Sequence, residues 1–160
     1  MPPAPSDHRK PSADGEVASQ DEPQTRSLVG FQLVLAAEPA ALSVIRDRFR
    51  QWLKAHQWPA AELADLVLAV SEAASNVVEH AYPHGRSGDI EIDGCVTVLP
   101  GGARVVELTV RDRGCWRQIP DRPENQRRGI SLMRAVVAEL VIDGTERGTC
   151  VRMRGRHPGR

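Results

Sequence analysis

The chain has very little lysine and no net charge. Lys10 and Lys54 are its only lysines, and neither follows a glycine. A P-loop, which needs Gly-Lys-Ser/Thr after a glycine-rich turn, is therefore absent, and any phosphate must be held in another way. Basic (Lys and Arg) and acidic residues both number 21, so no overall field draws the protein to nucleic acid or to an anionic membrane. We expect no direct binding to either.

Cysteines and long apolar runs are also scarce. Cys95, Cys115 and Cys150 are far apart, odd in number and form no Cys-x-x-Cys pair, so they imply neither a disulfide framework nor a zinc site. No apolar run approaches the roughly 20 residues of a membrane span, and the N-terminus is polar and rich in proline where a signal peptide has an apolar core. We expect a soluble, cytoplasmic protein.

The length and composition predict one domain with two tails. Residues 1–27 are rich in Pro, Ser, Asp, Glu and Gln, so they cannot bury enough apolar surface to offset the entropy of ordering, and we predict a disordered tail. Residues 28–155 have the size of a single domain. Residues 156–160 form a short basic tail.

Hydrophobic periodicity predicts the secondary structure of this domain. The expected order is a strand at 29–35, a helix from Glu38-Pro39 to about 57, a second helix ending near Tyr82-Pro83, a hairpin of 89–99 and 103–112, a helix traced by Ile130, Met133, Val136, Val137 and Leu140, and a hairpin of 140–143 and 149–154. This order predicts an α/β (α+β) two-layer sandwich, with a mixed β-sheet and helices on one face.

The second helix carries a polar pair beside its apolar stripe. Glu72 and Asn76 are four residues apart and therefore point the same way. An amide oxygen can ligate Mg²⁺ and a carboxylate can accept a proton, so the pair suits phosphate chemistry. Taken alone, such a pair more often lies on a solvated helix face.

Two further motifs follow in the chain. Asp112-Arg113-Gly114 ends a strand with a carboxylate that can accept from a purine amino group, although Asp-x-Gly is also common at ordinary turns. Arg127-Arg128-Gly129-Ile130-Ser131-Leu132-Met133 places a basic loop before an apolar-periodic helix. The free N–H groups at such a helix start can bind phosphate without a lysine, and an ordinary helix start is the alternative.

In this order the motifs resemble the Bergerat-type ATP-binding fold of DNA gyrase, heat-shock protein 90, histidine kinases and anti-sigma-factor serine/threonine kinases. They are most similar to those of the last group. Residues 71–82 resemble its N-box, Asp112-Arg113-Gly114 its first glycine box and residues 128–133 its second. Gly148-Thr149 resembles a late segment whose threonine supports the adenine-binding carboxylate. Trp116 stands where the family usually has another glycine, which bears on ATP affinity.

The resemblance implies a role for each matching residue. Glu72 would be the general base and Asn76 the Mg²⁺ ligand, and Asp112 would contact adenine with support from Thr149. Residues 115–128 would form the ATP lid. The other nucleotide-binding positions would be Gly114, Arg128, Gly129, Ile130, Ser131 and Leu132, with the backbone of the last four holding phosphates.

The resemblance also implies a function in transcription regulation. The chain would be an ATP-binding anti-sigma factor that phosphorylates an anti-anti-sigma antagonist protein and holds a sigma factor, as a homodimer formed through its first strand and helix. The alternative is a catalytically inactive nucleotide-binding module that sequesters its partner. Glu72 favours the enzyme. A structural domain without nucleotide would require three chance matches in order.

Overall fold

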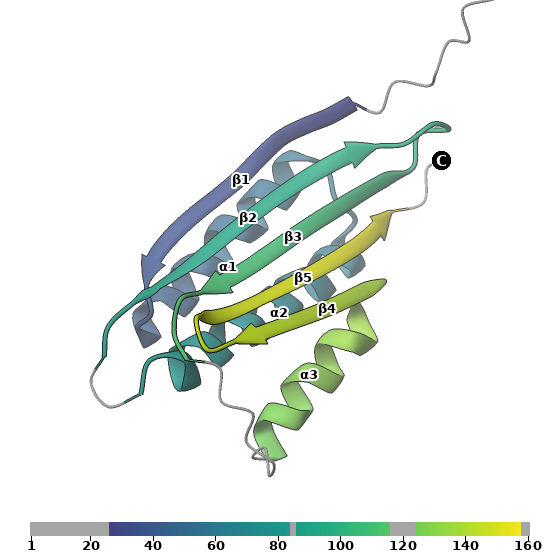
Figure 1. The fold of residues 1–160 in the computed structure, drawn as a ribbon. Coiled ribbons are helices and arrows are strands. Elements are labelled where there is room, and N and C mark those ends of the chain that lie inside the picture. The colour runs from purple at the N-terminus through teal and green to yellow at the C-terminus, as the bar shows by residue number, and fades with distance from the viewer. Residues whose placement is uncertain (1–25, 84–85, 116–123, 158–160) are drawn as a thin grey trace, which may run out of the picture.

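The fold consists of a five-stranded sheet and a layer of helices (Figure 1). The structure, a computed structural model, describes residues 26–83, 86–115 and 124–157. In chain order the elements are β1 (Arg26–Ala36), α1 (Pro39–Ala55), α2 (Ala60–Asn76), the π-helical turn η1 (Val77–Ala81), β2 (Asp89–Val98), β3 (Arg104–Asp112), α3 (Glu124–Val136), β4 (Glu139–Thr145) and β5 (Gly148–His157). The predicted order of strands and helices is confirmed.

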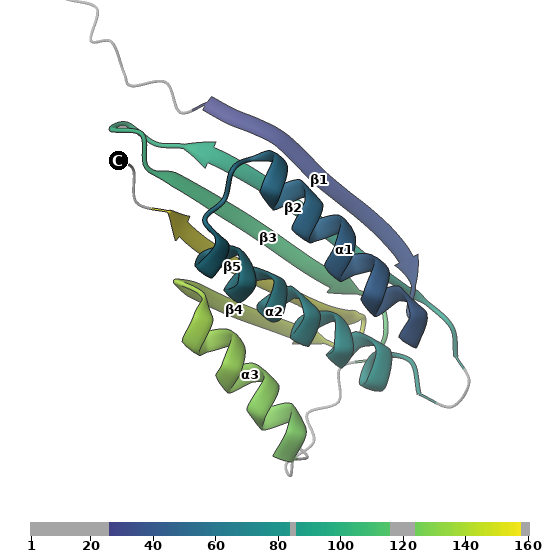
Figure 2. The ribbon, with the colours of Figure 1, turned by 180° about the vertical axis from the view of Figure 1, so that it is seen from behind.

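The strand order is β1-β2-β3-β5-β4, and every pairing in the described part of the chain is antiparallel. All helices cover one face of the sheet, as Figure 2 shows, which confirms the predicted two-layer sandwich. The prediction of a mixed sheet was wrong. The pairs β2–β3 and β4–β5 are hairpins, whose strands must run in opposite directions, and β5 then returns antiparallel beside β3.

The core lies between the sheet and the helices. Alternate residues of β2 and β3 point toward the helices, as period-2 patterning requires. The buried set includes Ile90, Ile92 and Val96 of β2, Val106, Leu108 and Val110 of β3, Ile45, Phe49 and Leu53 of α1, Val70 and Ala73 of α2, and Met133 of α3. Each large side chain in this set contributes about 1.5–3 kcal/mol through burial, so the position of α2 on the sheet is firmly determined.

Both ends of the domain extend beyond their predicted limits. Arg26 and Ser27, predicted to be tail, belong to β1 and pair with Val98 and Thr97. At the other end β5 runs to His157, two residues into the predicted basic tail. Composition identified the polar segments but not these short extensions, because a strand is held by backbone hydrogen bonds that any residue except proline can donate.

The third helix begins and ends earlier than predicted. It spans Glu124–Val136, whereas Leu140 belongs to β4 and lies opposite Met153 of β5. Leu140 fits the apolar period of both the preceding helix and the following strand. It belongs to the strand because it pairs with Met153 of β5. Five residues assigned to the ATP lid, 124–128, are therefore helical, and 116–123 of that segment lie outside the described residues.

Candidate functional site

Asp112 ends β3 and is the only buried charged residue among those whose side chains are described, with 4% of its surface exposed. Its Oδ1 accepts the backbone N–H of Gly114 at 2.9 Å and the backbone N–H of Thr149 at 3.2 Å. The two donors fix the carboxylate in one orientation. Within the described ranges they are its only hydrogen-bond partners, so Oδ2 remains available to a ligand.

Thr149 lies beside Asp112, as the resemblance implied. The hydrogen bond between them is donated by the backbone N–H of Thr149. The close approach depends on Gly148, the first residue of β5. Its φ of +129° disfavours any side chain, and a Cβ there would lie 2.1 Å from the carbonyl oxygen of Asp112. The sequence motif contained this glycine, but only the pairing of β5 with β3 reveals its contact with Asp112.

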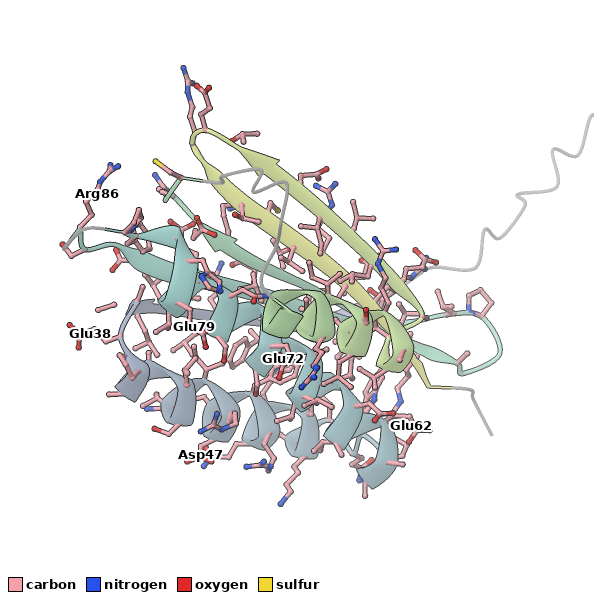
Figure 3. The ribbon with its side chains drawn as sticks, turned by 90° about the horizontal axis from the view of Figure 1, so that it is seen from below. Glu38, Asp47, Glu62, Glu72, Glu79 and Arg86 are labelled. Atoms are coloured by element: carbon pink, nitrogen blue, oxygen red, sulfur yellow. The ribbon has the colours of Figure 1, made fainter. Side chains whose placement is uncertain are left out.

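Glu72 and Asn76 lie on the last turns of α2, and both side chains are half-buried. The Glu72 carboxylate faces α3, because a Cβ added at Gly129 would lie 2.8 Å from Glu72 Oε2. Figure 3 shows Glu72 between these two helices, with Glu79 farther along the same helical segment. Asn76 has no hydrogen-bond partner among the described residues, so its amide oxygen is free to bind a ligand.

The predicted helix start at Gly129 was wrong. Because α3 begins at Glu124, the N–H groups of Gly129, Ile130, Ser131 and Leu132 come after the first turn, where they bond within the helix. Phosphate binding by these groups would require α3 to begin later than it does here. Glycine usually weakens a helix by about 1 kcal/mol, and here its lack of a side chain lets α3 approach Glu72.

The other residues of the second glycine box differ in exposure. Arg128, Ser131 and Leu132 are exposed, Ile130 is half-buried and Gly129 is buried. Arg128 is part of α3, the helix that approaches Glu72, and its side chain lies at the surface.

The end of η1 joins the two halves of the site. The carbonyl oxygen of Ala81 accepts the N–H of Cys115 at 3.0 Å, and a Cβ on Gly114 would lie only 2.0 Å from the same oxygen. The glycine of Asp112-Arg113-Gly114 is therefore required by its contact with η1, which directly continues α2, the helix that carries Glu72 and Asn76. No sequence pattern predicted the π-helical turn η1 (Val77–Ala81). Such turns are rare and often occur at functional sites.

Residues 35–155, most of the chain, match the histidine kinase-like ATPase domain family. The chain therefore belongs to this family, which confirms the ATP-binding fold that its three motifs resemble. Within the described residues no helix is both long and apolar enough to cross a membrane.

Among solved structures, the chain is similar to the RsbU and RsbW domains of Rv1364c from Mycobacterium tuberculosis. The identity is 27% and the TM-score 0.62, with 83% of this chain and 34% of that chain covered, so this chain spans about a third of its length. The chain is also similar to the histidine kinase domain of a blue-light activated histidine kinase from Erythrobacter litoralis EL346. The identity is 19% and the TM-score 0.44, and the match covers 71% of this chain and 59% of that chain. A second structure of that kinase has 25% identity and a TM-score of 0.46, and the match covers 60% of this chain and 30% of that chain.

Proposed function

We propose that this protein binds MgATP and transfers the γ-phosphate to a serine or threonine of an anti-anti-sigma antagonist protein. The observation that carries the proposal is the buried Asp112, because a charged side chain is rarely buried without a use for its free oxygen. Oδ2 can accept the exocyclic amino group of adenine while Oδ1 stays with its two backbone donors. Membership of an ATPase domain family supports the same ligand.

In the proposed reaction Glu72 acts as general base. Its carboxylate takes the proton of the substrate hydroxyl as that oxygen forms a bond to the γ-phosphorus, and the bond to the bridging oxygen breaks to release ADP. Glu72 suits this role because it is half-buried and lies on the same helical face as Asn76. Arg128, exposed near the start of α3, would offset phosphate charge.

Asn76 fits the magnesium ion that this chemistry requires. Its side chain offers a neutral oxygen without a competing partner among the described residues, and Mg²⁺ prefers oxygen ligands. When bound, the ion neutralises charge on the phosphates. Asn76 would orient the nucleotide relative to Glu72, one helical turn away.

The proposed partners are a sigma factor, held when the antagonist is phosphorylated, and a second copy of this chain. β1 is an edge strand of the sheet, and Val34 in it is 61% exposed, which supports dimerisation through β1 and α1. Such partner switching regulates transcription without direct contact with DNA.

Incubation with γ-labelled MgATP and candidate antagonist proteins from the same genome tests the proposal. Label should appear on a serine or threonine of one antagonist. Nucleotide binding without any transfer would instead support a module that only sequesters its partner.

Replacement of Asn76 by alanine should weaken MgATP binding at least about tenfold, because a metal ligand is lost. The unfolding temperature should change little, since the side chain makes no hydrogen bond to any described residue. Calorimetric titration with MgATP measures the effect, and titration with ATP in excess EDTA is the control. An unchanged dissociation constant for MgATP would remove Asn76 from the site.

Gly129→Ala should keep or raise stability, by up to about 1 kcal/mol, because alanine favours the helix. The methyl group meets the flexible end of Glu72, which can turn away at little cost. We nevertheless expect transfer to fall at least about tenfold, because the displaced carboxylate no longer reaches the substrate hydroxyl. Single-turnover kinetics measures this loss. Gly30→Ala is the matched control, since its methyl would lie at an ordinary 3.5 Å from the Gly94 carbonyl oxygen. A variant with wild-type transfer would show that α3 does not constrain Glu72.

A further inference from the structure

The hydroxyl of Tyr82 lies between the ends of two neighbouring strands. It accepts the backbone N–H of Arg113 at 3.0 Å and donates to the carbonyl oxygen of Asp89 at 2.9 Å. The register of β2 and β3 ends at the pair of Ile90 and Asp112, so Asp89 and Arg113 would form the next pair. The phenol hydroxyl bridges these two backbone groups in place of a direct ladder bond.

This insertion changes what holds the segment after Asp112. Three successive N–H groups find acceptors outside the β2–β3 ladder: that of Arg113 on Tyr82 Oη, that of Gly114 on Asp112 Oδ1, and that of Cys115 on the Ala81 carbonyl oxygen. Two of the three acceptors belong to the end of η1 and the residue after it. The helix that carries Asn76 therefore positions the turn that holds the Asp112 carboxylate.

Gly88 allows the aromatic ring of Tyr82 to reach this position. A Cβ at Gly88 would lie 2.1 Å from the ring atom Cε1 and 2.7 Å from the hydroxyl oxygen. The ring thus passes directly over the backbone that leads into β2. The position of the Tyr82 ring therefore requires glycine at residue 88, because any side chain there would overlap the ring.

We propose that Tyr82 is a positioning residue for adenine recognition, acting through the turn that follows Asp112. By holding Arg113 it keeps the Gly114 N–H on Asp112 Oδ1, which leaves Oδ2 directed at the base. Without the hydroxyl, Arg113 and Gly114 can shift, and the carboxylate loses the fixed orientation on which discrimination between adenine and guanine depends. This inference rests on the proposed adenine contact of Asp112.

Hydrogen exchange of the full-length, nucleotide-free protein tests the positioning without reference to ATP. In Tyr82→Phe, which keeps the ring, the amides of Arg113, Gly114 and Cys115 should exchange faster than in wild type, while amides of the β1–β2 ladder should not change. Ser43→Ala, which removes a hydroxyl that donates to the Ala40 carbonyl oxygen at 3.0 Å on α1, is the control. Unchanged exchange at these three amides would overturn the positioning role.

Nucleotide titrations then test the link to adenine. Tyr82→Phe should bind MgATP about three- to tenfold more weakly, as expected for the loss of one hydrogen bond, and its preference for MgATP over MgGTP should narrow. Gly88→Ala, which displaces the ring, should likewise weaken MgATP binding and reduce the preference for MgATP over MgGTP. Faster exchange with an unchanged ATP/GTP ratio would refute the adenine role of Tyr82. Failure of the proposed Asp112 contact would instead appear in the wild-type protein, as equal affinity for the two nucleotides.

Discussion

Glu72→Gln should reduce phosphate transfer to the antagonist by roughly 10²–10⁴-fold, the usual contribution of a positioned general base. Glutamine has the same size but cannot take a proton from the substrate hydroxyl. The affinity for MgATP should stay near that of wild type, because the change removes basicity and leaves Asn76 and Asp112 in place. Calorimetry and single-turnover transfer, measured on the same preparation, separate the two quantities.

Glu79→Gln provides the matched control. Glu79 lies on the same helical segment, but its side chain is 53% exposed and its Oε2 is 3.4 Å from His80 Nε2. The same chemical change there should leave transfer within about twofold of wild type, since exposed pairs of this kind contribute little. A large loss from Glu79→Gln with none from Glu72→Gln would move the base to Glu79.

The pair of variants also distinguishes the two proposed functions. A kinase loses transfer and keeps binding in Glu72→Gln. A module that only sequesters its partner shows no transfer in the wild type, and both variants then bind MgATP and partner as the wild type does. Because Gly129 lies against Glu72 here, a low but measurable rate in the wild type would indicate that α3 limits access to the base.

Local patterns predicted those elements in which sequence period and burial agree. Hydrophobic periodicity predicted α1, in which Ile45, Phe49 and Leu53 are buried. It also predicted the β2–β3 hairpin, in which Ile92 and Leu108 are buried. In both cases the apolar face is the buried face, so the local pattern already contains the tertiary information.

The errors occurred where a long-range contact overrides the local pattern. Gly129 looks like a helix boundary, yet α3 continues through it because glycine permits contact with Glu72. The contact of Gly114 with the Ala81 carbonyl oxygen also depends on residues far apart in sequence. The motifs predicted candidate site residues, but only the packing of the strand ends on η1 shows what Gly114 touches.

Substitutions of Asp112 should distinguish its contribution to the stability of the fold from its proposed contribution to adenine recognition. In Asp112→Asn the amide oxygen can still accept the N–H groups of Gly114 and Thr149, so the free energy of unfolding should change by less than about 1 kcal/mol. The amide nitrogen then faces the base. It repels the amino group of adenine but can donate to the carbonyl oxygen of guanine.

We therefore expect the ATP/GTP affinity ratio of Asp112→Asn to fall roughly 5–150-fold, the equivalent of the 1–3 kcal/mol cost of an unsatisfied buried group. Asp112→Ala should lose the same preference and also unfold more easily, by about 1–3 kcal/mol for each backbone donor left without an acceptor. Asp93→Asn is the control, because Asp93 lies on β2 and has no hydrogen bond or ion pair with any described residue. Titration with both nucleotides and urea denaturation measure the two effects. If Asp112→Asn kept the wild-type preference for ATP, the carboxylate would be a structural anchor for the ends of β3 and β5, and adenine would be recognised elsewhere.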